Sequence, residues 1–140
     1  LSERQYTVNV LHVGQVTHDR LRGLDLLVVG APTQKMGMTD PMKNFLAELP
    51  SDVLQGIHVA AFDTRITINE THSRVARFAM RVFLHRYAAE PIEAALKAKG
   101  AESVIVPEGF FVLDKEGPLA DGELERIPSW VDQILHTVIA

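Results

Sequence analysis

The sequence predicts an α/β fold with a mainly parallel sheet. Short continuous apolar runs, typical of strands covered on both faces, alternate with stretches whose apolar residues recur every three or four positions, as in amphipathic helices. This alternation continues along the whole chain, without repeats, low-complexity tracts or linkers. A length of 140 residues, with 46% hydrophobic and 23% charged residues, fits one globular domain, residues 1–140. Strands alternating with helices are the pattern of layered α/β domains.

The first half of the chain contains three predicted strands and one helix. Tyr6–Val13 mixes apolar and polar residues on both faces, which indicates a strand near a sheet edge. Asp25–Gly30 is a continuous apolar run closed by glycine, and Ile57–Phe62 is a second buried-type strand that stops at Asp63. Between them, Asp40 is expected to cap a helix that has Pro41 at its first position and one apolar face formed by Met42, Phe45, Leu46 and Leu49.

The second half begins with helical periodicity. Apolar residues repeat at helical spacing over Ile66–His85, and arginines share the polar side. Pro91 is expected to start a further helix, Pro91–Lys99, which Gly100 ends. Short strands around a Pro-Glu-Gly turn are expected at Ser103–Val106 and Phe110–Leu113.

A last helix is predicted from Asp121 or Gly122 to about Ile139. Pro128 lies inside this pattern and should kink the helix or delay its start. Glu123 and Glu125, near the helix start, are better explained by the helix dipole than by acid–base catalysis.

Several functional classes find no support in the composition. The net charge of −4 gives no basic footprint for nucleic acid, and no apolar run is long enough to cross a membrane. There are no cysteines, and the six histidines lack the spacing of a metal site, so we expect no metal. No nucleophile elbow, Walker loop or dinucleotide fingerprint is present, so we assign no catalytic residue. The absence of cysteine is compatible with a cytoplasmic location.

Two strand ends carry distinctive chemistry, and ligands of open parallel sheets bind at the carboxyl ends of strands. After the first buried strand come polar backbone and side chains together with soft methionines, namely Pro32, Thr33, Gln34, Lys35, Met36, Gly37 and Met38. After the second comes a charged turn, Phe62-Asp63-Thr64-Arg65. These segments suit a polar heterocycle. Alternatively, Pro-Thr only shapes a turn and Asp63 only pairs with Arg65.

Four ordered blocks of sequence resemble flavodoxin-family proteins, and most closely prokaryotic flavodoxin-domain proteins with the Phe-Asp-Thr-Arg turn. The blocks span essentially the whole chain: LDLLVVGAPTQ (24–34), VAAFDTR (59–65), PEGFFV (107–112) and GPLADGELER (117–126). The resemblance implies a three-layer sandwich around a parallel sheet of strand order 2-1-3-4-5 that holds FMN non-covalently.

The resemblance also implies a role for each strand and loop. Tyr6–Val13 resembles the second strand, Asp25–Gly30 the third, Ile57–Phe62 the fourth and the region 103–113 the fifth. The loop of residues 32–38 corresponds to the one beside the flavin ring, and Asp63, Thr64 and Arg65 to the second ring-side loop. Met36 or Met38 would cover the ring, because neither loop contains a tyrosine or tryptophan.

One departure from the family is large. The first strand, its phosphate-binding loop and the first helix have no counterpart in this sequence, where only LSERQ precedes Tyr6. That strand would lie between the second and third strands, and its loss would leave buried N–H and C=O groups unpaired at about 1–3 kcal/mol each. We therefore expect an N-terminally truncated sequence lacking about 35–40 residues, the length of a typical strand–helix unit. Alternatively, the flanking strands close up, or another chain supplies the strand.

The leading functional hypothesis is an FMN-binding electron-transfer protein, in which the cofactor carries the redox chemistry. Its partner would be a redox protein or a small-molecule electron acceptor, and a homo-oligomer is also compatible with the sequence. An NAD(P)H-linked flavin reductase of the quinone reductase type is one alternative, so whether the protein is an enzyme stays open. A flavin-free interaction domain is the other alternative.

Overall fold

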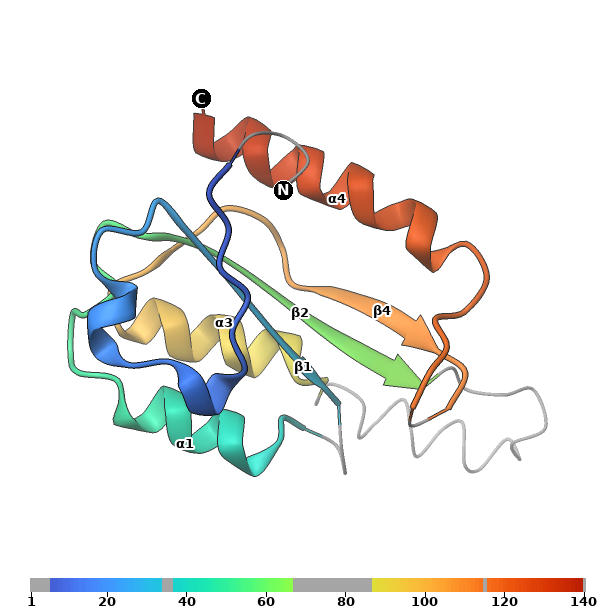
Figure 1. Cartoon of the computed structure of the whole chain (residues 1–140), viewed down its shortest axis with the longest axis horizontal. Coiled ribbons are helices and arrows are strands. Elements are labelled where there is room, and N and C mark those ends of the chain that lie inside the picture. Colours follow the sequence, from blue (N-terminus) through green and yellow to red (C-terminus); the bar gives the residue numbers. More distant parts are fainter. Residues whose placement is uncertain (1–5, 34–36, 67–86, 115, 140) are drawn as a thin grey trace.

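A parallel sheet forms the middle layer of the molecule, with helices on both faces (Figure 1). The structure is a computed structural model that describes residues 6–33, 37–66, 87–114 and 116–139. The predicted helix over residues 66–85 lies almost entirely outside these ranges. The described elements are, in order, η2 (Val13–Gln15), η3 (His18–Leu21), β1 (Leu26–Pro32), α1 (Asp40–Glu48), β2 (His58–Ile66), α3 (Ala89–Ala98), β3 (Glu102–Ser103), β4 (Glu108–Val112) and α4 (Glu123–Ile139).

Strand β2 is central among the described strands. It pairs in parallel with β1 on one side and with both β3 and β4 on the other. β3 pairs with the start of β2, from His58, and β4 with its end, from Phe62. Together β3 and β4 therefore occupy the position of one interrupted strand, which agrees with the single final strand expected over residues 103–113.

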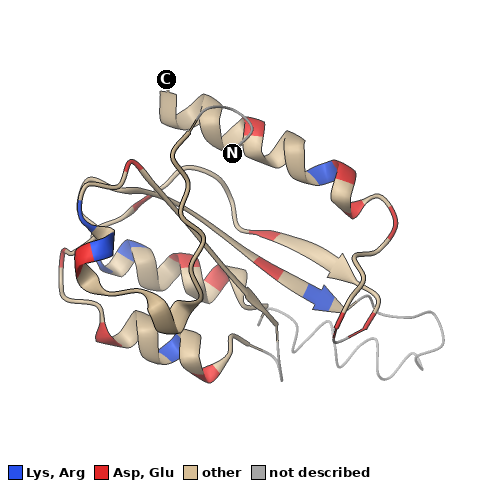
Figure 2. Ribbon diagram, viewed as in Figure 1, with Lys and Arg blue, Asp and Glu red and all other residues tan. Residues whose placement is uncertain are grey.

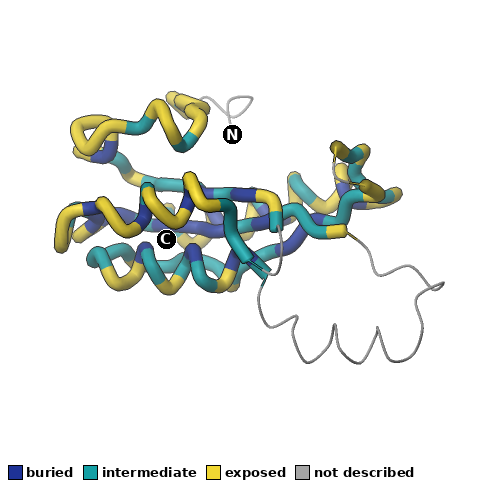
Figure 3. The backbone as a smooth tube through the Cα atoms, turned by 90° about the horizontal axis from the view of Figure 1, so that it is seen from below, coloured by how far each residue is buried: buried dark blue, intermediate teal, exposed yellow. Residues whose placement is uncertain are grey.

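Alternation along β2 separates two cores. Val59 and Ala61 point to the face covered by α1 and α3, where they pack with buried residues of those helices. Ala60 and Phe62 point to the opposite face, where they contact Trp130 of α4 and its neighbours. In the view of Figure 3, buried positions of the helices face inward and exposed ones outward. The period of two along the strand therefore decides which helix each residue of β2 meets.

The prediction that Tyr6–Val13 forms a strand was wrong. Residues 6–12 have no regular secondary structure, and η2 begins at Val13 with His12 as its N-cap. A strand needs a hydrogen-bonded neighbour, and among the described residues no strand pairs with this segment. Val10 is 90% exposed, so the mixed alternation of the segment does not correspond to burial in a sheet.

The prediction that the second buried strand stops at Asp63 was also wrong. β2 continues through Asp63, Thr64 and Arg65 to Ile66, so these residues form the end of a strand and not a turn. The strand continues because β4 pairs with it from Phe62 to Ile66 on the side away from β1. β4 itself begins at Glu108, so most of the predicted Pro-Glu-Gly turn belongs to a strand.

Three helix starts also differ from the predictions. The cap of α1 is Thr39 and not Asp40, because the Thr39 Oγ1 accepts a hydrogen bond from the Met42 N–H (3.4 Å). α3 begins at Ala89, two residues before Pro91, and a proline is tolerated within a first helical turn. α4 begins at Glu123 and runs through Pro128, so this proline does not delay the helix start.

Candidate functional site

The carboxyl ends of β1 and β2 lie side by side, as expected for parallel neighbours. Pro32 is in register with Thr64, and the Thr33 N–H donates a hydrogen bond to the Thr64 carbonyl (2.8 Å). Five of the ten residues that the sequence suggested as ring contacts are thereby brought together at one edge of the sheet: Pro32, Thr33, Asp63, Thr64 and Arg65.

Asp63 and Arg65 form a bidentate ion pair at this edge. Arg65 Nε lies 2.7 Å from Asp63 Oδ1, and Arg65 Nη2 lies 2.8 Å from Asp63 Oδ2. Asp63 is fully buried, and the guanidinium of Arg65 stacks on the Tyr87 ring with its Cζ 3.4 Å from the ring centroid. In Figure 2 the two charges follow one another towards the end of β2. This is the pairing that the sequence left open as an alternative to ligand contact.

The same strand ends satisfy the first N–H groups of α3. The Ala88 N–H donates to Thr33 Oγ1 (3.1 Å), and the Ala89 N–H donates to Asp63 Oδ2 (3.0 Å). The carboxylate also faces the positive end of the helix dipole, a favourable position for an anion. Asp63 reaches α3 because it continues the series Val59 and Ala61, which faces that side of the sheet. Thr33 and Asp63 thus join two strand ends and one helix start.

A glycine on the neighbouring strand makes room for the ion pair. A Cβ on Gly109 of β4 would overlap the guanidinium of Arg65. β4 packs beside this part of β2, with Gly109 in register with Asp63. The ion pair therefore depends on three elements of the fold: the end of β2, the start of α3 and the glycine backbone of β4.

The loop after β1 is described only in part. Gln34, Lys35 and Met36 lie outside the described residues. Gly37 is half-buried, and Met38 packs against the core beside α1 and α3. Pro32 is exposed at the edge of the sheet, so its ring is accessible to a ligand.

A second charged cluster fastens α4 to β4. Arg126 contacts Glu123 (Nη1 to Oε2, 2.7 Å) and Glu108 (Nη2 to Oε1, 2.9 Å), and Glu123 also accepts a hydrogen bond from the Phe111 N–H (2.8 Å). The side-chain hydrogen bond from Arg126 lowers the pKa of Glu123, although burial opposes the shift. Glu123 therefore does more than balance the helix dipole, because it ties the first turn of α4 to the strand.

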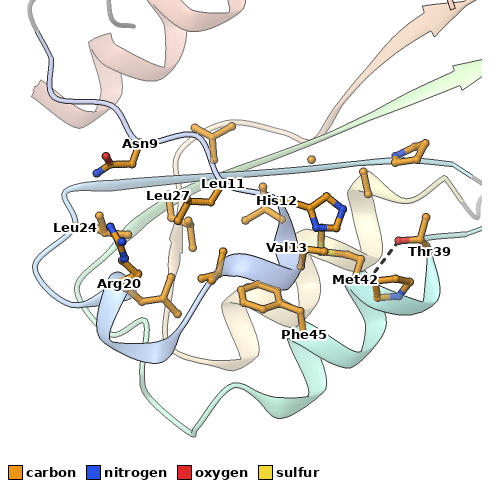
Figure 4. A pocket seen from close by; sticks show the side chains of 18 residues that line it. Asn9, Leu11, His12, Val13, Arg20, Leu24, Leu27, Thr39, Met42 and Phe45 are labelled. Carbon is orange, nitrogen blue, oxygen red and sulfur yellow. Dashed lines mark hydrogen bonds between the residues drawn. The ribbon is translucent and has the colours of Figure 1, made fainter. Parts of the chain in front are cut away.

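A cavity of about 620 Å³ lies along β1 on the side away from β2 (Figure 4). Its walls come from β1, from the segment Asn9–Leu21 and from the start of α1, and they are mainly aliphatic. The cavity extends from Leu24, near the amino end of β1, to Pro32 and Thr39 at the carboxyl end. The size lies within the usual range for ligand pockets, about 300–1,000 Å³.

Sequence reasoning missed Tyr87 and Gly109. The stacking of Tyr87 on Arg65 had no sequence signal, because the two residues are joined only by the fold. The Gly in PEGFFV offered a weak signal, since a glycine inside a strand often marks the close approach of another group. Its partner could be identified only once β2 and β4 were known to be neighbours.

Two other features are absent from the described residues. No group of three or more His, Asp or Glu residues could hold a metal ion within the described ranges. No helix in that part of the chain is long and apolar enough to cross a membrane.

The architecture is that of a mainly parallel, open α/β sandwich, the class expected of a flavodoxin-like domain. No protein-family profile and no curated protein sequence matches the chain. Among solved structures, the chain is similar to an oxidoreductase from Corynebacterium diphtheriae, with 22% sequence identity and a TM-score of 0.51 over 94% of this chain. The chain spans 64% of the length of that protein. At this identity the likeness concerns the fold.

Proposed function

We propose that this chain supplies the ring side of a flavodoxin-like, FMN-binding redox protein that transfers electrons in the cytoplasm. The observation that carries the proposal is the junction of the β1 and β2 carboxyl ends. There the Thr33 N–H donates a hydrogen bond to the Thr64 carbonyl, and Asp63 and Arg65 form a bidentate ion pair. Ligands of open parallel sheets bind at this edge. Two of the four sequence blocks that resemble flavodoxins contain segments that the resemblance assigns to the ring-side loops, and both segments end at this edge; the similar C. diphtheriae protein is an oxidoreductase.

The side chains at the junction limit how a flavin ring could be held. Asp63 and Thr33 already accept hydrogen bonds from α3, and Arg65 is paired and stacked. Contact with a ring would therefore use backbone groups near Thr33 and Gly37 and the exposed face of Pro32. FMN, when bound, supplies the electron-accepting and electron-donating chemistry. The role of the protein residues is to present a rigid edge and to shield one side of the ring from water.

The described residues do not fit the phosphate of FMN. An anion needs converging N–H groups at a helix start. The first turns of α1, α3 and α4 instead carry Asp40, Glu90, and Glu123 with Glu125, and the start of α3 already binds the carboxylate of Asp63. Additional negative charge at these helix starts would be repelled.

Titration with two flavins tests the proposal. Quenching of flavin fluorescence is measured with FMN and with riboflavin, which has the same ring but no phosphate. We expect both to bind, with dissociation constants within about threefold of each other. A phosphate held by charge-assisted hydrogen bonds, each worth about 1.5–3 kcal/mol, would instead favour FMN by at least tenfold. The absence of quenching by either flavin refutes the proposal.

A matched pair of variants locates the ring. Pro32→Glu places a carboxylate at the junction and should weaken riboflavin binding at least fivefold. Pro50→Glu, at an exposed proline after α1, should leave it unchanged. If both variants bind riboflavin like the parent protein, the ring does not lie at this edge.

A flavin-free interaction domain is the second candidate, and the acidic first turns of the three described α-helices favour it. It becomes the better explanation if neither flavin binds. The reductase alternative is distinguished by turnover of NAD(P)H and a quinone by the flavin-loaded protein, which an electron carrier does not catalyse.

A further inference from the structure

β4 lies beside β2 on the side of the sheet away from β1, and the backbone groups of its residues point alternately to either side. The Thr64 carbonyl accepts a hydrogen bond from β1, so the backbone groups of the next residue, Arg65, point to β4. Phe111 is in register with Arg65, and in a parallel pair such a partner points its own backbone groups away from its neighbour. By alternation the same holds for Gly109 and for Leu113, which follows the strand. These three residues therefore form the outer edge of β4.

Each of the three outward N–H groups already has an acceptor, and none of these acceptors belongs to another strand. The Phe111 carbonyl also accepts a hydrogen bond, from the Ala120 N–H (2.9 Å). An uncovered strand edge would present such groups unpaired. The edge of β4 is therefore closed by contacts within the chain. The three N–H groups donate as follows: Gly109 to Glu108 Oε1 (3.0 Å), Phe111 to Glu123 Oε2 (2.8 Å) and Leu113 to the Pro118 carbonyl (3.0 Å).

The segment that follows β4 supplies most of this closure. Leu119 forms an isolated antiparallel bridge with Val112, so the chain runs back beside the strand that it has just left. Figure 1 shows this segment between the end of β4 and the start of α4. A strand added to the sheet would have to pair with the same outward groups of β4. Residues 118–126 therefore form an edge cover, in the place where an added strand would lie.

Arg126 fastens the edge cover to β4. Its Nη2 lies 2.9 Å from Glu108 Oε1, and its Nη1 lies 2.7 Å from Glu123 Oε2. These two oxygens are the acceptors of the Gly109 and Phe111 N–H groups. The Glu123 side chain is 9% exposed, whereas that of Arg126 is 43% exposed. Because Glu123 bonds both to the strand and to Arg126, loss of its carboxylate would free the Phe111 N–H and leave Arg126 with one of its two carboxylates.

We propose that the edge cover is an autoinhibitory contact, and that its release lets two copies of this chain pair antiparallel through β4. Uncovered strand edges are ready templates for pairing with another chain. Two copies related by a two-fold axis present the same edge to each other, and such edges are self-complementary when they run antiparallel. The edge cover therefore keeps β4 from joining a second sheet. No flavin takes part, so this contact is independent of the proposed function.

Glu123→Ala and Glu125→Ala form the matched pair that tests the proposal. Both changes remove a carboxylate from the first turn of α4, but Glu125 is exposed and has no hydrogen bond to β4 in the described part of the chain. Sedimentation velocity over a range of protein concentrations measures the dimer association constant. Glu123→Ala should raise it about tenfold above that of the parent protein, the size expected from one hydrogen bond recovered per copy. Glu125→Ala should leave it unchanged. Equal association of the parent and Glu123→Ala, or equal effects of the two variants, overturns the proposal.

A second substitution tests whether the association uses the edge of β4. Leu113 is 57% exposed and directs its N–H outward, and lysines on edge strands prevent pairing between chains. The double variant Glu123→Ala/Leu113→Lys should therefore associate no more strongly than the parent protein. Dimers of the double variant that are as strong as those of Glu123→Ala would place the contact elsewhere and overturn the proposal.

Hydrogen exchange followed by NMR separates edge pairing from general unfolding. In dilute Glu123→Ala the Phe111 amide should exchange faster than in the parent protein, and at concentrations that favour the dimer its exchange should slow about tenfold or more. The Phe110 amide points to β2 and should change little. Unchanged exchange of Phe111 on association, or faster exchange of Phe110 in the same samples, contradicts pairing through β4.

The parent protein provides a test that does not depend on a folded variant. Native proteins open locally as cooperative units, so amides covered by one segment exchange together. In urea too dilute to unfold the core, the Phe111, Leu113 and Ala120 amides should exchange at similar rates, about tenfold or more faster than Phe110. Exchange of all four amides at one common rate would mean that the edge cover does not open separately from the fold, and the proposal would then be wrong.

Discussion

Replacement of Arg65 by methionine tests whether the ion pair at the end of β2 stabilises the fold. The change removes two hydrogen bonds of 2.7 and 2.8 Å to Asp63, and it leaves a fully buried carboxylate with the Ala89 N–H as its remaining described partner. Breaking a buried ion pair in this way costs about 3–5 kcal/mol. Domains of ordinary stability have about 5–15 kcal/mol in total, so Arg65→Met should be folded but markedly weakened.

Urea unfolding followed by tryptophan fluorescence measures this loss. Trp130 is the single tryptophan, is 8% exposed and packs edge-on against Phe62 and Phe110, so its emission should report unfolding of the core. The expected decrease in the free energy of unfolding corresponds to a fall in Tm of roughly 10–20 °C for a domain of this size.

The controls separate the ion pair from a general effect of losing an arginine. Arg22→Met removes a partner of Asp19 in an exposed pair separated by 3.8 Å, and it should cost less than about 1 kcal/mol. In the double variant Asp63→Asn/Arg65→Met, no buried charge remains and the amide oxygen can still accept from Ala89. The double variant should therefore be more stable than Arg65→Met alone. A cost below about 1 kcal/mol for Arg65→Met, or additive costs in the double variant, would refute the reasoning.

Three further changes test other parts of the fold. Gly30→Ala should destabilise by about 1–3 kcal/mol in urea unfolding, because its Cβ would overlap the Phe62 ring, whereas Gly37→Ala, with no atom within 4 Å of the new Cβ, should be nearly neutral. Thr39→Ala should cost about 0.5–2 kcal/mol through loss of the α1 cap, and an unchanged urea midpoint would contradict the capping role. The lowered pKa of Glu123 means that its carboxylate stabilises the fold above its ordinary pKa of 4.5, and that this contribution is lost as pH falls through the lowered value. Glu123→Gln should therefore flatten the acid decline of stability measured by urea unfolding between about pH 5 and pH 2, and an unaltered pH profile would argue against it.

The strands that could be predicted were those that helices cover on both faces of the sheet. Strand β1 and the Val59–Phe62 part of β2 are continuous apolar runs because both faces of the sheet are covered, and that coverage leaves a strong signal in the sequence. Tyr6–Val13 failed for the opposite reason. Its alternation is compatible with a strand, but a strand also requires a paired neighbour, and a single segment contains no information about its neighbour.

The helix starts show a similar limit. The sequence placed the start of α3 at Pro91 because proline marks a first turn, but the helix begins where its N–H groups find acceptors. Those acceptors are Thr33 and Asp63, which lie 55 and 26 residues before their partners Ala88 and Ala89. A local pattern cannot reveal a cap supplied from so far away, so this start could be located only from the assembled fold.

Asp63 and Thr33 are candidate ring contacts and also hydrogen-bond partners of α3, and this double role affects how the candidate site should be tested. Both residues were suggested by the sequence as ring contacts, yet both hold the start of α3. A variant of either one that loses flavin affinity would therefore not demonstrate contact, because a displaced α3 would disturb the same edge. Pro32 is exposed and has no N–H to lose, so a substitution there changes the edge without removing a hydrogen bond from the sheet. Binding measured with Pro32→Glu consequently separates contact with the ring from support of the fold, which substitutions at the more conspicuous Phe-Asp-Thr-Arg segment cannot do.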